Sequence, residues 1–222
     1  MIDWQDFFMG NEDFFKIPER GEVHLFHVER AGDVNFLNTF EKERYESYGM
    51  ETVARVFLKG RSSLRELGGF YTGNTPLFFD VEAGEGGKPY FHNWQDLHFN
   101  LSHSGEQLSL AFSSEPVGVD LERKERKGDF LELAKRFFHP EERARVESEG
   151  GGVFLEIWTA KEAMLKLAGK GIAAGLEKTR VLENGEGFLE STRIFLHRFE
   201  TEMCVGAVAS FSPIRVVREA TY

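Results

Sequence analysis

Short apolar runs alternate along the chain with longer segments in which apolar residues recur every three or four positions. The longer segments predict helices over 37–48, 52–67, 130–138 and 154–168. The short runs predict strands at 23–28, 77–81, 98–101, 107–112 and 117–121, and residues 178–209 alternate like further strands around turns such as Asn184-Gly185. Short turns between 98 and 121 favour an antiparallel meander. The pattern therefore predicts an α+β fold.

Glycine and proline predict where these elements break. Gly68 and Gly69 are expected to end the second helix, and Pro140 is expected to begin a helix with acidic residues in its first turn. Residues 83–90 and 148–152 are predicted to be loops because of their glycines. Residues 1–20 form an amphipathic lead-in whose purpose the pattern does not indicate.

A weak internal repeat suggests two similar halves. Glu41-Lys-Glu-Arg44 resembles Pro140-Glu-Glu-Arg143, and Phe57 and Arg61 align with Trp158 and Glu162 at nearly the same offset. The halves, 1–114 and 115–222, would each hold a small antiparallel sheet packed on helices and be related by a pseudo-twofold axis. Chance likeness of two amphipathic helices is the alternative. If the repeat holds, Arg61 and Glu162 face each other across a cleft that would suit a polyphosphate.

Composition narrows the classes of partner and compartment. Of 222 residues, 27 are Lys or Arg and 37 are Asp or Glu, which gives a net charge of −10. This argues against nucleic acid as the main partner, because phosphate binding needs a basic surface. The single cysteine, Cys204, excludes a disulfide framework or a cysteine metal cluster. We find neither a secretory signal pattern nor an apolar run of membrane-spanning length, so we expect a cytoplasmic protein with no membrane partner.

Three acids are candidates for a metal site. Asp120 and Glu122 end an apolar run and share one face at a strand period of two, and Glu162 lies in the helical segment 154–168. Three converging carboxylates would suit Mg²⁺, which prefers hard oxygen ligands. Solvated acids at a strand end, and a surface pair between Glu162 and Lys166, are the alternatives. Lys161 lies at the centre of the apolar side of this helix and therefore needs a partner or a ligand.

Two local sequences do not match well-known catalytic motifs. Gly87-Lys88-Pro89 is not a P-loop, because Pro89 stands where that motif has Ser or Thr. Ser102 and His103 are adjacent in sequence, but a catalytic pair is built by proximity in space. Neither sequence therefore identifies a reaction by itself.

Five short motifs, taken together, are more informative. They are Gly87-Lys88-Pro89, the stretch from Phe99 to Gly105 with Ser102 and His103, the stretch from Gly118 to Glu122, the stretch from Trp158 to Lys166, and Gly169-Lys-Gly171. In this order and spacing the set resembles the 4′-phosphopantetheinyl transferases of the Sfp type, over roughly residues 40 to 180. The resemblance implies transfer of 4′-phosphopantetheine from coenzyme A to a serine of an apo acyl or peptidyl carrier protein, with release of 3′,5′-ADP.

The resemblance also implies roles for individual residues. Asp120, Glu122 and Glu162 would hold Mg²⁺ against the coenzyme A pyrophosphate, and Lys166 and His103 would contact its phosphates. Gly87, Lys88, Pro89 and Arg44 would line the 3′-phosphate pocket, and Ser102 and Arg61 complete the candidate coenzyme A site. Glu162, directly or through a water on the metal, would accept the serine proton, with Asp120 and Lys166 as the other catalytic residues. Glu142 matches an acid with a supporting role near the metal.

The chain departs from the family near the 3′-phosphate. Glu82, Ala83 and Glu85 lie where some relatives have a basic residue, and Glu41 stands where some have lysine, so this pocket is expected to be less basic. We expect a monomer that docks its carrier through Arg123, Lys124, Arg126 and Lys127, or through Lys135 and Arg136. Fatty acid, polyketide and peptide synthesis all fit. The alternatives are a non-catalytic module that binds the carrier protein or coenzyme A, and a hydrolase of the coenzyme A pyrophosphate.

Overall fold

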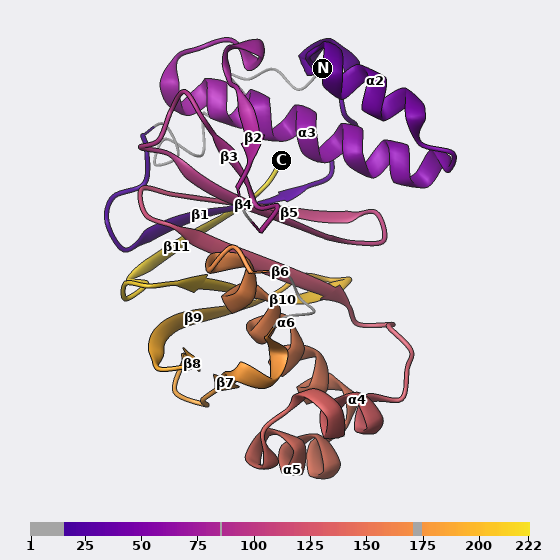
Figure 1. Ribbon diagram of the computed structural model, residues 1–222, viewed down its shortest axis with the longest axis vertical. Coiled ribbons are helices and arrows are strands. Elements are labelled where there is room, and N and C mark those ends of the chain that lie inside the picture. Colours follow the sequence, from indigo (N-terminus) through magenta and orange to yellow (C-terminus); the bar gives the residue numbers. More distant parts are fainter. Residues whose placement is uncertain (1–15, 85, 171–174) are drawn as a thin grey trace.

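The computed structural model describes residues 16–84, 86–170 and 175–222, which form an α+β fold (Figure 1). The strands are β1 (Glu22–Val28), β2 (Val81–Ala83), β3 (Pro89–Phe91), β4 (His98–Ser104), β5 (Gln107–Ser113), β6 (Val117–Arg123), β7 (Thr179–Val181), β8 (Glu186–Leu189), β9 (Thr192–Glu200), β10 (Cys204–Ser210) and β11 (Val216–Thr221). The helices are α2 (Thr39–Ser47), α3 (Glu51–Thr72), α4 (Phe130–Phe137), α5 (Pro140–Glu149) and α6 (Gly151–Leu167), and short 3-10 turns are η2 (Val34–Phe36), η3 (Pro76–Phe78) and η5 (Leu176–Lys178). Most of the lead-in, Glu85 and Gly171 lie outside the described residues.

Two main sheets carry the fold. The first has the strand order β11-β1-β5-β4 and the second β6-β10-β9-β8-β7, while β2 and β3 form a small hairpin. The order β1-β5-β4 recurs as β6-β10-β9, so that in each sheet the first strand of a half lies beside the latest strand that the same half contributes to that sheet. This recurrence agrees with the predicted repeat, and the pseudo-twofold axis stays a prediction.

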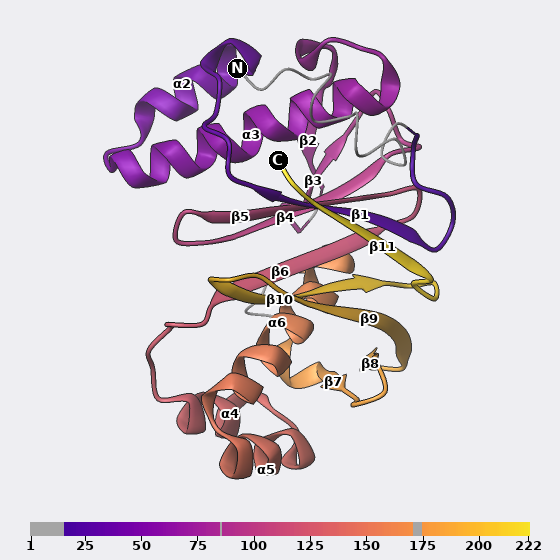
Figure 2. The ribbon, with the colours of Figure 1, turned by 180° about the vertical axis from the view of Figure 1, so that it is seen from behind.

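The strand pairing differs from the expected one in two places. The predicted meander is wrong, because β6 leaves the β4–β5 hairpin and pairs antiparallel with β10 in the second sheet. The first sheet is not purely antiparallel, because β11 lies parallel to β1 (Figure 2). The C-terminal strand, which lies within the predicted half 115–222, thus completes the sheet of the other half. The boundary between 114 and 115 itself stays a prediction.

The apolar residues pack in three clusters that separate four layers. Alternate residues of β1 and β6, among them Val23, Leu25, Val117 and Val119, pack between the two sheets. Helix α3 covers the outer face of the first sheet, and α6 covers the outer face of the second, as Figure 1 shows. Because strand residues alternate between faces, the intervening residues Gly118, Asp120 and Glu122 point toward α6.

Two local predictions are corrected by the structure. Helix α3 continues through Gly68 and Gly69 to Thr72 and ends at Gly73, which has a left-handed φ of 69°. A Cβ at Gly68 would lie 2.9 Å from the Phe91 ring, so the glycine serves helix packing and does not stop the helix. The predicted strand at 77–81 begins as the 3-10 turn Pro76–Phe78.

The segment between α5 and α6 is also shorter than expected. Residues 148–152 were expected to form a loop, but only Gly150 separates the two helices. Its φ of 88° gives the sharp change of direction that an L side chain rarely allows. Across the described ranges of the chain, no helix has the length and apolar character needed to cross a membrane.

Candidate functional site

The site begins where α6 crosses β6 at very short range. A Cβ at Gly118 would lie 2.1 Å from the Ala163 carbonyl oxygen and 2.5 Å from the Leu167 nitrogen. Only glycine allows this approach. Because Ala163 and Leu167 each follow a candidate site residue, the contact sets Glu162 and Lys166 of the helix over the acids of the strand.

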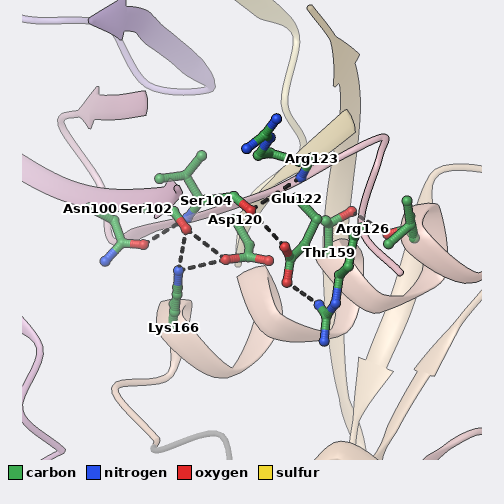
Figure 3. A network of polar contacts seen from close by, with 11 residues as sticks. Asn100, Ser102, Ser104, Asp120, Glu122, Arg123, Arg126, Thr159 and Lys166 are labelled. Carbon is green, nitrogen blue, oxygen red and sulfur yellow. Dashed lines mark hydrogen bonds and ion pairs between the residues drawn. The ribbon is translucent and has the colours of Figure 1, made fainter. Parts of the chain in front are cut away.

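Asp120 is the most enclosed of these acids, with 3% of its surface exposed. Its Oδ1 accepts hydrogen bonds from Ser102 Oγ (2.7 Å) and Lys166 Nζ (2.6 Å), and Lys166 also donates to Ser102 Oγ (2.7 Å), as Figure 3 shows. Its Oδ2 is buried and has no hydrogen-bond partner. A buried carboxylate oxygen without a donor is costly unless a cation or water reaches it.

Glu122 lies two residues further along the same face and is paired on both oxygens. Its Oε2 accepts a hydrogen bond from Ser104 Oγ (2.8 Å), and its Oε1 forms an ion pair with Arg126 (Figure 3). The Arg126 guanidinium also lies 5.1 Å from the centre of the Trp158 ring. Glu122 therefore already has a cationic partner from the chain itself.

Glu162 completes the set of acids from the helix side, with 7% of its surface exposed. Burial raises the pKa of Glu162 to about 7, and the charges of Asp120 and Glu122 add to this rise against the opposing charges of Lys166 and Arg126. The rise comes mainly from burial, which disfavours the charged form of the carboxyl group. It also places proton exchange near neutral pH.

The three acids fit a divalent cation without forming a finished metal site. Within the described parts of the chain, no three His, Cys, Asp or Glu side chains are already arranged to hold a metal ion. The buried Asp120 Oδ2, which has no hydrogen-bond partner, is nevertheless an oxygen that a hard cation could reach. The predicted ligand set of Asp120, Glu122 and Glu162 stays a prediction.

A cleft of about 1000 Å³ lies next to these acids. Its lining includes six Lys or Arg side chains against two Glu, on a chain whose net charge is −10. The predicted residues Arg44, Arg61, Gly87, Lys88, Pro89, His103 and Lys166 all line it, together with Arg123 and Lys170. Ser102 is buried beside the cleft, where it joins Lys166 to Asp120. The cleft therefore concentrates positive charge where the sequence predicted a phosphate ligand.

One wall of the cleft carries Arg61, whose charge a buried acid partly neutralises. Arg61 Nε lies 3.2 Å from Glu41 Oε1, and the fully buried Arg65 donates to Glu41 Oε2 (2.8 Å). Arg61 Nη1 is buried and has no hydrogen-bond partner. Glu41, noted in the sequence as a departure from the family, thus acts on Arg61 directly. The expected opposition of Arg61 and Glu162 stays a prediction.

Lys88 has a structural role in addition to its place in the cleft. Its Nζ donates to the carbonyl oxygens of Val117 (2.7 Å) and Leu167 (3.3 Å), which belong to β6 and α6. Burial lowers the pKa of Lys88 to about 8. The lysine thus ties the hairpin loop of the first half to the strand and helix that carry the acids.

Lys161 finds the partner that its position required. It is fully buried, its Nζ lies 2.8 Å from Glu142 Oε2, and it donates to the Thr179 carbonyl oxygen (2.5 Å). Glu142 also accepts hydrogen bonds from the backbone nitrogens of His139 and Val181 (2.8 and 2.7 Å). In this structure Glu142 therefore supports the packing of α5 on α6, and its predicted role beside the metal stays a prediction.

Sequence reasoning named Ser102 as a site residue but missed Asn100 and Ser104, which form a polar row with it on β4. Asn100 Oδ1 accepts a hydrogen bond from the Val119 nitrogen (2.8 Å), and Ser102 and Ser104 bind Asp120 and Glu122. These three residues alternate along β4 and so share the face toward β6, although the two strands belong to different sheets. The alternation itself is visible in the sequence and was the available signal.

The basic residues expected to dock a carrier are largely paired with local acids. Arg123 pairs with Glu125 (2.8 Å), Lys124 with Glu200 (2.5 Å), and Lys135 with Glu132 (2.5 Å). Arg126 is occupied by Glu122, as described above. The predicted patch is therefore less positive than its sequence indicates.

A basic cleft beside buried carboxylates on an α+β scaffold is typical of proteins that bind phosphorylated ligands at a divalent cation. Residues 116–207 match the family model of the 4′-phosphopantetheinyl transferase superfamily. The matched segment contains Asp120, Glu122, Glu162 and Lys166. The family resemblance seen in the sequence is thus confirmed.

Curated relatives carry the same family name. The chain is 35% identical over 119 residues to a 4′-phosphopantetheinyl transferase of Bacillus subtilis, which covers 52% of each protein. It is 38% identical over 107 residues to the 4′-phosphopantetheinyl transferase Sfp of Bacillus subtilis strain 168, covering 46% of this chain and 47% of that one. It is 36% identical over 147 residues to the 4′-phosphopantetheinyl transferase HetI of Nostoc sp., covering 62% and 61%. The matches thus span about half to three fifths of these relatives.

Proposed function

We propose that this protein transfers the 4′-phosphopantetheine moiety of coenzyme A to a serine of an apo acyl or peptidyl carrier protein. The observation that carries the proposal is the basic cleft that leads to three buried or half-buried acids, two of them on β6 and one on α6. The family of residues 116–207 and the names of the relatives support the same activity. We further propose that two halves are related by a pseudo-twofold axis, since the strand order recurs in both sheets. We also propose that the protein is a monomer.

Each group in the cleft has a part in binding coenzyme A. Arg44, Arg61 and Lys88 would bind its 3′-phosphate end, and His103 and Lys166 its pyrophosphate, because these side chains line one continuous cleft. Asp120, Glu122 and Glu162 would hold Mg²⁺, which supplies neutralisation of the pyrophosphate charge when bound. Lys166 remains positioned by Asp120 and Ser102, so its ammonium is held at the border between the acids and the cleft.

The proposed reaction is a phosphoryl transfer with balanced bonds. The serine oxygen of the carrier forms a bond to the β-phosphorus of coenzyme A, and the bond from that phosphorus to the bridging oxygen breaks. The leaving group is 3′,5′-ADP. Glu162 would accept the serine proton as the general base, because its carboxylate lies on α6 beside the other acids of the site.

The decisive experiment measures the intact mass of apo carrier proteins incubated with this protein, coenzyme A and Mg²⁺, with EDTA as the metal-free control. We expect a mass gain of one phosphopantetheine that EDTA abolishes. No gain across several carrier types, with coenzyme A binding intact, would favour a binding module. Breakdown of coenzyme A without a carrier would favour a pyrophosphate hydrolase.

A matched pair of variants tests the site. Asp120→Asn keeps the side-chain shape but removes the charge beside Lys166, and we expect transfer to fall by about a hundredfold or more with the fold intact. Asp96→Asn makes the same change at an exposed position and should leave the rate unchanged. Wild-type activity in Asp120→Asn would refute the assignment of Asp120 to the site.

A further inference from the structure

Arg126 forms an ion pair with Glu122, which is one of the three proposed metal ligands. It forms an ion pair with Glu122 Oε1 while Ser104 holds Oε2, so both oxygens of this carboxylate are engaged (Figure 3). Arg126 is 30% exposed and Glu122 is 19% exposed, so the pair sits at the border of the site and is not locked in the core. A cation that enters here must compete with the guanidinium.

Asp120, the other acid on β6, still has one carboxylate oxygen without a partner. Lys166 and Ser102 share the single oxygen Oδ1 of Asp120, and Oδ2 has no hydrogen-bond partner. A metal ion can therefore reach Asp120 without displacing Lys166. Among the residues that the structure describes, Lys166 and Arg126 contact the strand acids, and of these two Arg126 stands directly in the way.

The position of Arg126 outside the strand would allow its side chain to move away from Glu122. Arg126 lies beyond Arg123, the last residue of β6, after a turn in which the Arg126 backbone nitrogen donates to the Arg123 carbonyl oxygen (2.9 Å), and so it is outside the sheet ladder. Its guanidinium lies 5.1 Å from the centre of the Trp158 ring, a cation–π contact that adds to the hold of Glu122. Movement of the side chain alone would free the carboxylate.

We propose that Arg126 is a positioning residue that acts as a tethered counter-cation, holding Glu122 until a divalent cation displaces it. The proposal rests on the proposed metal role of Asp120, Glu122 and Glu162. Without the metal, the guanidinium offsets repulsion among the acids. With the metal, that same contact must be broken, so Arg126 weakens the affinity of the site for its cation.

The test is the binding of Mn²⁺ alone, followed by the electron paramagnetic resonance signal of the free ion, in the absence of coenzyme A. Mn²⁺ accepts the same oxygen ligands as Mg²⁺. We expect Arg126→Gln to bind Mn²⁺ about tenfold more tightly than the wild type, which corresponds to about 1.4 kcal/mol. Arg145→Gln removes the same charge from a surface pair on α5 and should bind like the wild type.

Two further variants keep the outcomes distinct. Arg126→Lys retains the charge and should stay closer to the wild type than Arg126→Gln. Equal or weaker Mn²⁺ binding by Arg126→Gln, while Asp120→Asn still weakens binding in the wild-type background, would overturn the role of Arg126 alone. Equal Mn²⁺ binding by the wild type and Asp120→Asn would overturn the metal assignment, and this proposal with it.

Discussion

The approach of α6 to β6 at Gly118 allows a sharp test of how the site is assembled. In Gly118→Ala the added methyl group would lie 2.1 Å from the Ala163 carbonyl oxygen, whereas ordinary contact begins near 3.4 Å. The neighbours are backbone atoms of a helix and cannot turn aside. Helix and strand must therefore move apart by roughly 1 Å, since a packed interior has no spare space.

The expected losses of stability and of activity follow from this displacement of the helix. Overpacking of this kind typically lowers the free energy of unfolding by about 1–3 kcal/mol. The shift also moves Glu162 and Lys166 away from Asp120. It therefore lengthens the contact between Lys166 Nζ and Asp120 Oδ1, which is 2.6 Å in the wild type. A displacement of about 1 Å in a catalytic geometry can reduce the rate about a hundredfold. We therefore expect a larger loss in transfer than in folding.

The assay combines the rate of mass gain on an apo carrier with urea unfolding followed by circular dichroism. Gly152→Ala is the control, because it lies in the first turn of α6 and its Cβ would have no atom within 4 Å. That change should stabilise the helix by roughly 0.5–1 kcal/mol and leave transfer intact. A Gly118→Ala protein with the wild-type rate and unfolding midpoint would refute the reasoning.

Two further predictions concern stability. Lys161→Met removes the cation that lies 2.8 Å from the buried Glu142 carboxylate, and it should lower the free energy of unfolding, measured in urea, by about 3–5 kcal/mol. The double variant Lys161→Met/Glu142→Gln should recover part of this loss. Purely additive effects of the two substitutions would contradict the prediction. Contacts with His197 and His27 lower the pKa of Glu219 to about 2. The ionised Glu219 carboxylate thus stabilises the fold fully above its ordinary value of 4.5, and the effect is lost as the pH falls toward about 2. The difference in urea midpoint between wild type and Glu219→Gln should shrink over that range, and growth on acidification would count against it.

Local rules accounted for much of the candidate site. A strand period of two set Asp120 and Glu122 on one face, and that face does turn toward α6. Helical spacing placed Lys161 inside the core, where Glu142 meets it. Both results depend only on backbone periodicity and on the cost of burying an unpaired charge, which the order of residues specifies directly.

Periodicity and turn patterns did not predict which strands pair when the partners are distant in sequence. The run from Val117 to Arg123 has the same strand pattern whether it pairs with β5 or with β10, and the structure pairs it with β10. The C-terminal strand β11 was missed, and its parallel pairing with β1 joins the two ends of the described chain. A strand carries unpaired donors and acceptors on both edges, so its own sequence does not state which edge is filled or by what.

The sequence by itself predicted most of the elements, the acids on their strand and helix, and the family resemblance that the match of residues 116–207 supports. Only the tertiary structure decided that Gly118 lets α6 approach, that Lys88 joins the two halves, and that Arg126 is the partner of Glu122. The physical reason is the separation along the sequence of the residues that interact. Periodicity and burial act between neighbours along the chain, whereas ion pairs and close backbone contacts depend on which surfaces the completed sheets bring together.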